Sequence, residues 1–276
     1  MKGSPAILTY FSCSFKIFLM GIFIFILGLA FGSFANVCIY RLPKSKSILS
    51  PGSYCPECKK PIRWYDNIPL ISYFILKGKC RNCKSPISPR YPVVEFLTGM
   101  LFYLVYRKFG FNFSLLIYLI LILSLVIISG IDLDTFLIPD VIVIPGIILG
   151  LFFSFLYPQM FGMERVKSFL YSLTGAIAGA IILLFLGFVG KIMAKKEAMG
   201  GGDVKLLAMV GAFVGWKSIL ITLFFASLIG TLITLILVLI GVKKIQDYVP
   251  FGPYLSLGAM VSIFWKGYTF LGFYIP

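Results

Sequence analysis

Apolar residues fill most of the chain in runs long enough to cross a membrane, and one polar segment interrupts them. The first run covers residues 17–39, enough to cross the roughly 30 Å hydrocarbon core of a bilayer. It is longer than the apolar part of a signal peptide, so we expect a helix that stays in the protein. The other apolar segments predict helices over residues 93–106, 113–130, 141–156, 169–193, 204–214, 219–240 and from 250 onward. The pattern predicts an all-α polytopic membrane protein with about eight transmembrane helices.

The polar interruption, residues 41–91, is basic and rich in proline, and it holds four of the six cysteines. We expect a small soluble domain inserted between the first and second helices. The chain is therefore predicted to have three parts. These are a first transmembrane helix (residues 1–40), a cysteine-bearing domain (41–91) and a membrane domain (92–276).

Composition and charge support a membrane protein. Hydrophobic residues make up 59% of the chain and charged residues only 13%, where a soluble domain has about a quarter. The formal charge of +15 does not indicate nucleic acid, because basic loops of a membrane protein mark its cytoplasmic side and meet anionic lipid headgroups. With the N-terminus outside, the eight-helix arrangement places most Lys and Arg residues inside. The cysteine-bearing domain, Asp132 and Asp203 are then all expected at the cytoplasmic face of a multi-pass membrane protein.

The cysteines of the inserted domain form two pairs with metal-ligand spacing, Cys55-x-x-Cys58 and Cys80-x-x-Cys83. Two such pairs are typical of tetrahedral zinc held by four thiolates, and a domain of about fifty residues needs a staple of this kind. Two disulfides are the alternative, which a cytoplasmic location disfavours because thiols stay reduced there. Since cysteine would fill every coordination position, the zinc is predicted to be structural and not hydrolytic.

The chain has no histidine, which excludes Ser-His pairs, Cys-His pairs and His-ligated zinc hydrolases. Carboxylates are costly at a membrane boundary and therefore mark candidate sites. Asp203 follows three glycines at the start of one predicted helix, and Asp132 follows another. Two carboxylates that share a site cannot both ionise easily, so one can activate water while the protonated one hydrogen-bonds a scissile carbonyl. The glycines would let an extended substrate approach Asp203.

Asp134 is the alternative partner for Asp203. Helical positions two apart point about 200° away from each other, so only one of Asp132 and Asp134 is expected to face Asp203. Three nearby charged residues are expected to have other roles. Asp140 follows Pro139 and is predicted to cap the next helix. Lys205 and Glu197 are predicted to be charges at the membrane interface.

Taken in order, the motifs resemble those of the type IV prepilin peptidases, the prepilin leader peptidase/N-methyltransferases among the GxGD aspartyl proteases. The matching segments cover nearly the whole chain. They are Gly32-Ser33-Phe34-Ala35-Asn36-Val37, Tyr40-Arg41-Leu42-Pro43, the four cysteines, Asn67-Ile68-Pro69, Arg90-Tyr91-Pro92-Val93-Val94-Glu95, Ile131-Asp132, Pro139-Asp140, Gly200-Gly201-Gly202-Asp203 and Pro250-Phe251-Gly252-Pro253. Ala35 departs from the leucine often found there. The cysteine-bearing insert argues against the archaeal preflagellin branch, which resembles only the second half.

The resemblance implies an aspartyl endopeptidase that removes the basic leader of type IV prepilins or pseudopilins at the cytoplasmic side of the inner membrane. It also implies N-methylation of the new N-terminal residue, with S-adenosylmethionine as methyl donor. The family's catalytic aspartates match Asp132 and Asp203, supported by Gly200, Gly202 and Asp134. No nucleotide-binding pattern is found for the methyl donor. Its site stays unassigned, with Glu95, Arg41 and Asn36 offered because they lie near the cysteine-bearing domain.

Prepilins or pseudopilins and membrane lipid are the expected partners, and nucleic acid is not. Two other classes of function compete with this interpretation. A proton-coupled transporter could use Asp132 and Asp203 as a relay, but it predicts inverted repeats, and no clear repeat is found. A membrane scaffold with a zinc domain and no activity would leave the paired aspartates unexplained. Oligomeric state and the particular pilin stay open.

Overall fold

The computed structural model describes residues 5–50, 52–194, 200–242, 244, 249–265, 268–270 and 273–274. By internal contacts the chain divides into two compact units, Met1–Leu115 and Leu116–Pro276. Each unit is described by itself, and the three-part division of the sequence stays a prediction.

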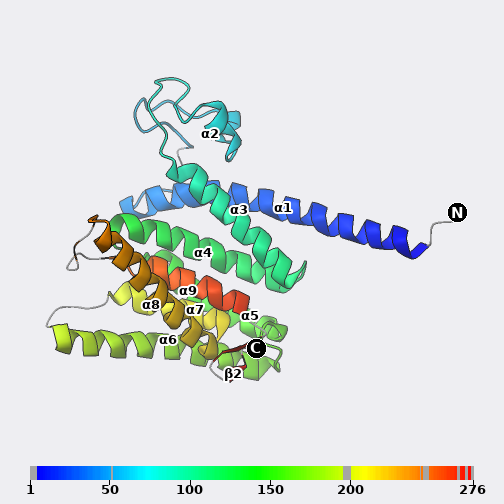
Figure 1. Cartoon of the computed structure of the whole chain (residues 1–276), viewed down its shortest axis with the longest axis vertical. Helices are drawn as coiled ribbons and strands as arrows, with labels where there is room; N and C mark the ends of the chain where they lie inside the picture. Colours follow the sequence, from blue (N-terminus) through cyan, green and yellow to red (C-terminus); the bar gives the residue numbers. More distant parts are fainter. Residues whose placement is uncertain are drawn as a thin grey trace. The chain divides into compact units, whose positions relative to one another are not determined.

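Unit 1 consists of two long helices and the cysteine-bearing segment. Its elements are α1 (Pro5–Arg41), η1 (Leu42–Lys44), η2 (Trp64–Asn67), α2 (Ile71–Ile75) and α3 (Arg90–Phe109). Helix α3 lies along α1, with the segment that carries α2 beyond the end where α1 stops and α3 starts (Figure 1). Glycines permit this close contact, because a Cβ at Gly32 would lie 2.7 Å from the Cα of Glu95. The pairing therefore brings Glu95 against the last turns of α1.

Unit 2 is a group of helices that ends in a short strand pair (Figure 1). Its elements are α4 (Phe113–Thr135), which starts just before the division between the units, α5 (Asp140–Leu156), η3 (Pro158–Met160), α6 (Arg165–Ala194), α7 (Gly201–Val214), α8 (Trp216–Leu239), α9 (Gly252–Trp265), β1 (Thr269–Phe270) and β2 (Phe273–Tyr274). Most helices lie within five residues of their predicted positions, but α1 begins at Pro5, twelve residues before its predicted start at residue 17. This strand pair and two isolated β-bridges in unit 1, Tyr54–Pro61 and Lys79–Pro86, are the departures from an all-α fold among the described residues.

Helix α7 is the centre of unit 2. All its residues from Leu206 to Val214 are buried, and it contacts α5, α6, α8 and α9. Small residues allow the approach, as in membrane helix pairs generally. A Cβ at Gly175 of α6 would lie 2.2 Å from the carbonyl oxygen of Gly211 in α7. The neighbours therefore fix α7, and with it Asp203 in its first turn.

Eight transmembrane helices are not confirmed. Four of the described helices are long and apolar enough to cross a membrane: Lys16–Lys44, Phe113–Thr135, Arg165–Ile192 and Trp216–Leu239. Helices α7 and α9 have 14 residues each. At 1.5 Å per residue each is about 21 Å long, which is shorter than the hydrocarbon core.

Candidate active site and metal centre

Asp203 lies in the first turn of α7, three residues after the N-cap residue Gly200. The backbone N–H of Asp203 donates to the Gly200 carbonyl at 3.1 Å. The positive end of the helix dipole favours a carboxylate in this first turn. The glycines differ in surroundings. A Cβ at Gly201 would meet nothing within 4 Å, whereas one at Gly202 would lie 2.8 Å from the Cβ of Ile138.

Asp132 lies in the last turn of α4 and is buried, with 4% of its surface exposed. Its Oδ2 atom accepts a hydrogen bond from the backbone N–H of Gly252, the first residue of α9, at 3.0 Å. The approach requires glycine, because a Cβ at Gly252 would lie only 2.6 Å from that oxygen. The carboxylate is thus held by the start of a helix 120 residues away in sequence.

The structure brings the two carboxylates into one site. The Ile138 side chain lies beside Gly202, which precedes Asp203, and beside Gly252, which donates to Asp132. The end of α4 and the starts of α7 and α9 therefore converge on one place. A pair of carboxylates, one buried and held by a backbone N–H and the other half-buried in the first turn of a helix, can carry acid–base hydrolysis without histidine or metal.

The other charged residues near the two aspartates lie outside the pair. Asp134 is exposed, as expected for a residue two positions from the buried Asp132. The predicted capping role of Asp140 is not observed, because Pro139 is the N-cap of α5 and no side-chain cap forms there. Both carboxylate oxygens of Asp140 instead accept hydrogen bonds from the Lys205 ammonium at 2.8 Å. Glu197 lies outside the described residues.

Sequence reasoning missed the role of Gly252. Its only signal was the Pro250-Phe251-Gly252-Pro253 motif at a helix start, where the missing side chain leaves room for Asp132. Nothing local in the motif indicates its partner.

The four cysteines of unit 1 form a metal-ligand set, with all their Sγ atoms within 4.8 Å of one another. The Sγ atoms of Cys55 and Cys83 are 3.8 Å apart. A tetrahedral ion with Zn–S bonds of about 2.3 Å needs sulfurs about 3.8 Å apart, whereas a disulfide needs about 2.05 Å. The Sγ atom of Cys83 and the Ser85 hydroxyl oxygen are 3.0 Å apart, within hydrogen-bond distance. The arrangement therefore fits a metal ion and not the disulfide alternative.

The two cysteine pairs sit in matching turns. In each, the residue after the second cysteine has positive φ, 57° for Lys59 and 61° for Lys84. The backbone N–H of Lys59 donates to the Cys55 carbonyl at 2.8 Å, and that of Lys84 donates to the Cys80 carbonyl at 3.0 Å. Each turn thus folds both of its thiols toward the centre.

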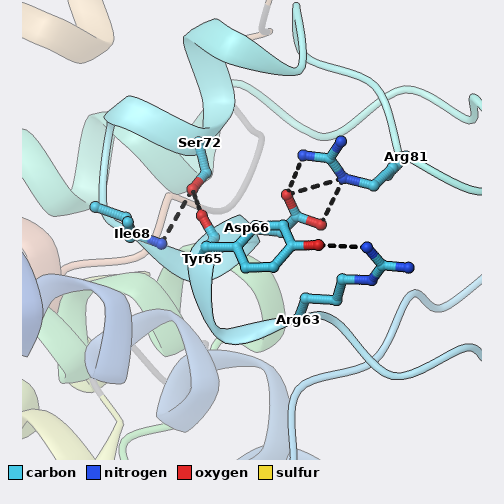
Figure 2. A network of polar contacts seen from close by, with 6 residues as sticks. All are labelled: Arg63, Tyr65, Asp66, Ile68, Ser72 and Arg81. Carbon is cyan, nitrogen blue, oxygen red and sulfur yellow. Dashed lines mark hydrogen bonds and ion pairs between the residues drawn. The ribbon is translucent and has the colours of Figure 1, made fainter.

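A polar network links the second turn to the rest of the domain (Figure 2). The Arg81 guanidinium donates to both carboxylate oxygens of Asp66, with contacts of 2.6 to 3.1 Å, and thereby lowers the pKa of Asp66. The Ser72 hydroxyl donates to the Tyr65 carbonyl at 2.8 Å and accepts from the Ile68 N–H at 3.0 Å. Together these contacts fix η2 and the residues that follow it.

A cavity of about 400 Å³ lies in unit 1 between the cysteine-bearing segment and the adjoining ends of α1 and α3. All three residues offered for the methyl donor line it. Asn36 donates to the Tyr91 carbonyl at 3.1 Å, and Arg41 donates to the Ser47 and Gly52 carbonyls at 3.0 and 3.1 Å. The Glu95 carboxylate accepts the Leu70 N–H at 2.8 Å.

Comparison with known proteins places the chain in a family. Residues 26–109 match the Bacterial Peptidase A24 N-terminal domain, and residues 119–235 match the Type IV leader peptidase family. The chain therefore belongs to the type IV leader peptidases. No solved structure matches it significantly.

Several curated relatives carry the name prepilin leader peptidase/N-methyltransferase. The chain is 42% identical over 233 residues to that of Klebsiella pneumoniae, covering 82% of this chain and 99% of the relative. It is 36% identical over 263 residues to that of Pseudomonas aeruginosa, covering 87% and 88%. With that of Myxococcus xanthus the identity is 41% over 221 residues, and the match spans 80% of this chain but only 64% of that relative's length.

Proposed function

We propose that this enzyme removes the leader of type IV prepilins or pseudopilins and then methylates the new N-terminal residue. Its family and the names of its relatives support both activities. The observation that carries the peptidase assignment is the buried Asp132 carboxylate beside Asp203 in a chain without histidine. A proton-coupled transporter finds no support in these relatives.

In the proposed mechanism, one aspartate takes a proton from the water that attacks the scissile carbonyl. The other, protonated, donates a hydrogen bond to the carbonyl oxygen, and a proton then passes to the leaving amine. The Gly252 N–H fixes one oxygen of Asp132, and the first turn of α7 positions Asp203 at the positive end of the helix. The two carboxylates are thus preorganised for hydrolysis before the substrate arrives.

The test is cleavage of a purified prepilin by Asp132→Asn and Asp203→Asn, with Asp140→Asn as a control carboxylate outside the pair. Each of the first two should lose on the order of 10³-fold or more in cleavage rate, because loss of a catalytic carboxylate removes acid–base catalysis. Asp140→Asn should stay within about 3-fold, since its ion pair is exposed. Full cleavage by either member of the pair would remove it from the mechanism.

For the cysteines we propose a structural zinc ion held by Cys55, Cys58, Cys80 and Cys83. The Sγ spacing supports this set, and the domain has few buried apolar residues of its own to stabilise it. The ion would fix the two turns, and it would have no open position for water.

We further propose that helices α3, α5, α7 and α9 also lie in the membrane, with the N-terminus outside and the active site facing the cytoplasm. The excess of basic residues in the segments this places inside supports the orientation, and these residues would meet anionic lipid headgroups. A helix as short as α7 can lie there because its neighbours bury it on all sides.

For the second activity, S-adenosylmethionine would supply an electrophilic methyl group. The acceptor is the new α-amine of the cleaved substrate, whose reference pKa of about 8 leaves part of it neutral near pH 7. Methylation therefore does not need the aspartate pair, and we propose that unit 1 serves it.

A further inference from the structure

The cavity of unit 1 has the size and the walls of a small-molecule site. Its volume of about 400 Å³ lies within the range of about 300–1,000 Å³ typical of such sites. Four tyrosine rings line it together with two buried polar side chains: Tyr40, Tyr54, Tyr73, Tyr91, Asn36 and Glu95. Aromatic faces stack on a nucleobase and attract cations.

Two of the four tyrosine rings that line this cavity make cation–π contacts with basic side chains of the chain itself. The Lys44 ammonium lies 3.6 Å from the centre of the Tyr40 ring, and the Arg41 guanidinium lies 6.0 Å from the centre of the Tyr54 ring. Walls of this kind can stack on a flat ring and attract a cation. A ligand that combines an adenine ring with a sulfonium and an ammonium group offers both.

One wall, residues 66–70, is held in a strained conformation. Leu70 has φ 60° and ψ −54°, and the Ile71 N–H donates to the Pro69 carbonyl at 2.7 Å across a γ-turn that non-glycine residues rarely adopt. The Glu95 carboxylate receives the Leu70 N–H at 2.8 Å and so anchors this turn to α3. At the other end of the wall, Arg81 forms an ion pair with Asp66 (Figure 2).

These contacts also connect the cavity to the metal centre. Arg81 lies between two metal-ligand cysteines, and Cys55 and Cys80 themselves line the cavity. Strain that the surrounding contacts maintain is characteristic of functional sites, and a wall fixed at both ends is preorganised for a ligand.

We propose that this cavity binds the adenosyl sulfonium methyl donor, with Tyr73 in its wall and Glu95 as a positioning residue that holds the Leu70 turn. The proposal rests on the methyltransferase activity proposed above and assigns that activity a place. It separates the two reactions, since the donor binds to residues of unit 1 and leader cleavage uses aspartates of unit 2.

The first test is direct binding. The purified, zinc-loaded full chain is titrated with S-adenosylmethionine, and labelled donor is cross-linked by ultraviolet light and mapped to peptides. We expect one site per chain and label within residues 33–95. Label confined to unit 2 would overturn the proposal while leaving methylation intact. A chain that cleaves prepilin but binds no donor would overturn the proposal together with the methyltransferase activity, and the peptidase would stand.

Matched variants then test the wall. Tyr73→Leu should weaken donor binding about ten-fold through loss of the ring, and Tyr73→Phe should keep it within about three-fold. Phe74→Leu is the control, because Phe74 is the next residue of α2 and is exposed outside the cavity wall. Equal affinity in Tyr73→Leu and Phe74→Leu would remove Tyr73 from the site.

Glu95 is tested by conservative rescue. Glu95→Ala should weaken binding about ten-fold, while Glu95→Gln should keep it within about three-fold, because its amide oxygen can still accept the Leu70 N–H. Leader cleavage and zinc content are measured on every preparation and should not change. Binding lost in both variants, or in neither, would contradict the positioning role.

Discussion

Replacing Gly252 by alanine tests the geometry of the aspartate pair without changing any ionisable group. The new Cβ would lie 2.6 Å from Asp132 Oδ2 and 3.4 Å from Ile138 Cδ1. A carbon and a carboxylate oxygen need about 3.3 Å, so the carboxylate must move by about 0.7 Å and its hydrogen bond from the Gly252 N–H must lengthen. A hydrogen bond to a charged group contributes about 1.5–3 kcal/mol, and a 1 Å misplacement at a catalytic centre costs about 10²-fold in rate. We therefore expect kcat/KM for leader cleavage to fall about 100-fold.

The assay is cleavage of purified prepilin in detergent or vesicles, followed at several substrate concentrations. Gly201→Ala is the matched control, because a Cβ there meets nothing within 4 Å and the residue is helical without positive φ. It should cleave within about three-fold of the wild-type rate. Membrane yield and thermal unfolding show whether each variant is folded. A folded Gly252→Ala that cleaves as fast as Gly201→Ala would refute the position assigned to Asp132.

Three further outcomes are expected. Asp134→Asn should keep substantial cleavage activity because its side chain is exposed, and an inactive but folded variant beside an active Asp132→Asn would mean that Asp134 is the partner of Asp203. Elemental analysis should find about one zinc ion per chain, and Cys80→Ser should reduce this to a small fraction. Metal-free wild-type protein with its four cysteines in disulfides would contradict both the proposed zinc site and the cytoplasmic orientation. Asp203→Asn should still methylate a pre-cleaved pilin, measured as methyl transfer from labelled S-adenosylmethionine, and loss of that transfer in a folded variant would tie both reactions to one site.

Much of the architecture was predictable because its signals are local. A membrane helix satisfies its own backbone hydrogen bonds, so a long apolar run is enough to place it. Apart from the earlier start of α1, the helices of the structure accordingly follow the predicted segments within five residues. The CxxC spacing likewise determines a local turn, so the cluster of four Sγ atoms could be predicted. Length and apolar composition mark only four of the described helices as able to cross a bilayer, and the short, buried α7 is not one of them.

The chemistry of the sequence identified Asp132 and Asp203 as candidates, since carboxylates are few and costly in such a chain and histidine is absent. Which side of α4 faces the pair was a matter of helix phase, and the burial of Asp132 agrees with the choice over Asp134. Asp140 was expected to cap the start of α5, but in the structure it binds Lys205. Lys205 lies 65 residues away and reaches it only because α5 and α7 are in contact.

By itself, then, the sequence determined the helices, the cysteine turns and which side chains are candidates for the chemistry, all of which depend on residue types and on residues close together in the chain. Only the tertiary structure decided that Gly252 holds Asp132 across 120 residues, and that Glu95 anchors the strained Leu70 turn across 25 residues. Such contacts depend on how separate helices approach one another. That approach depends on the summed packing of many small and large side chains, and no single motif encodes it.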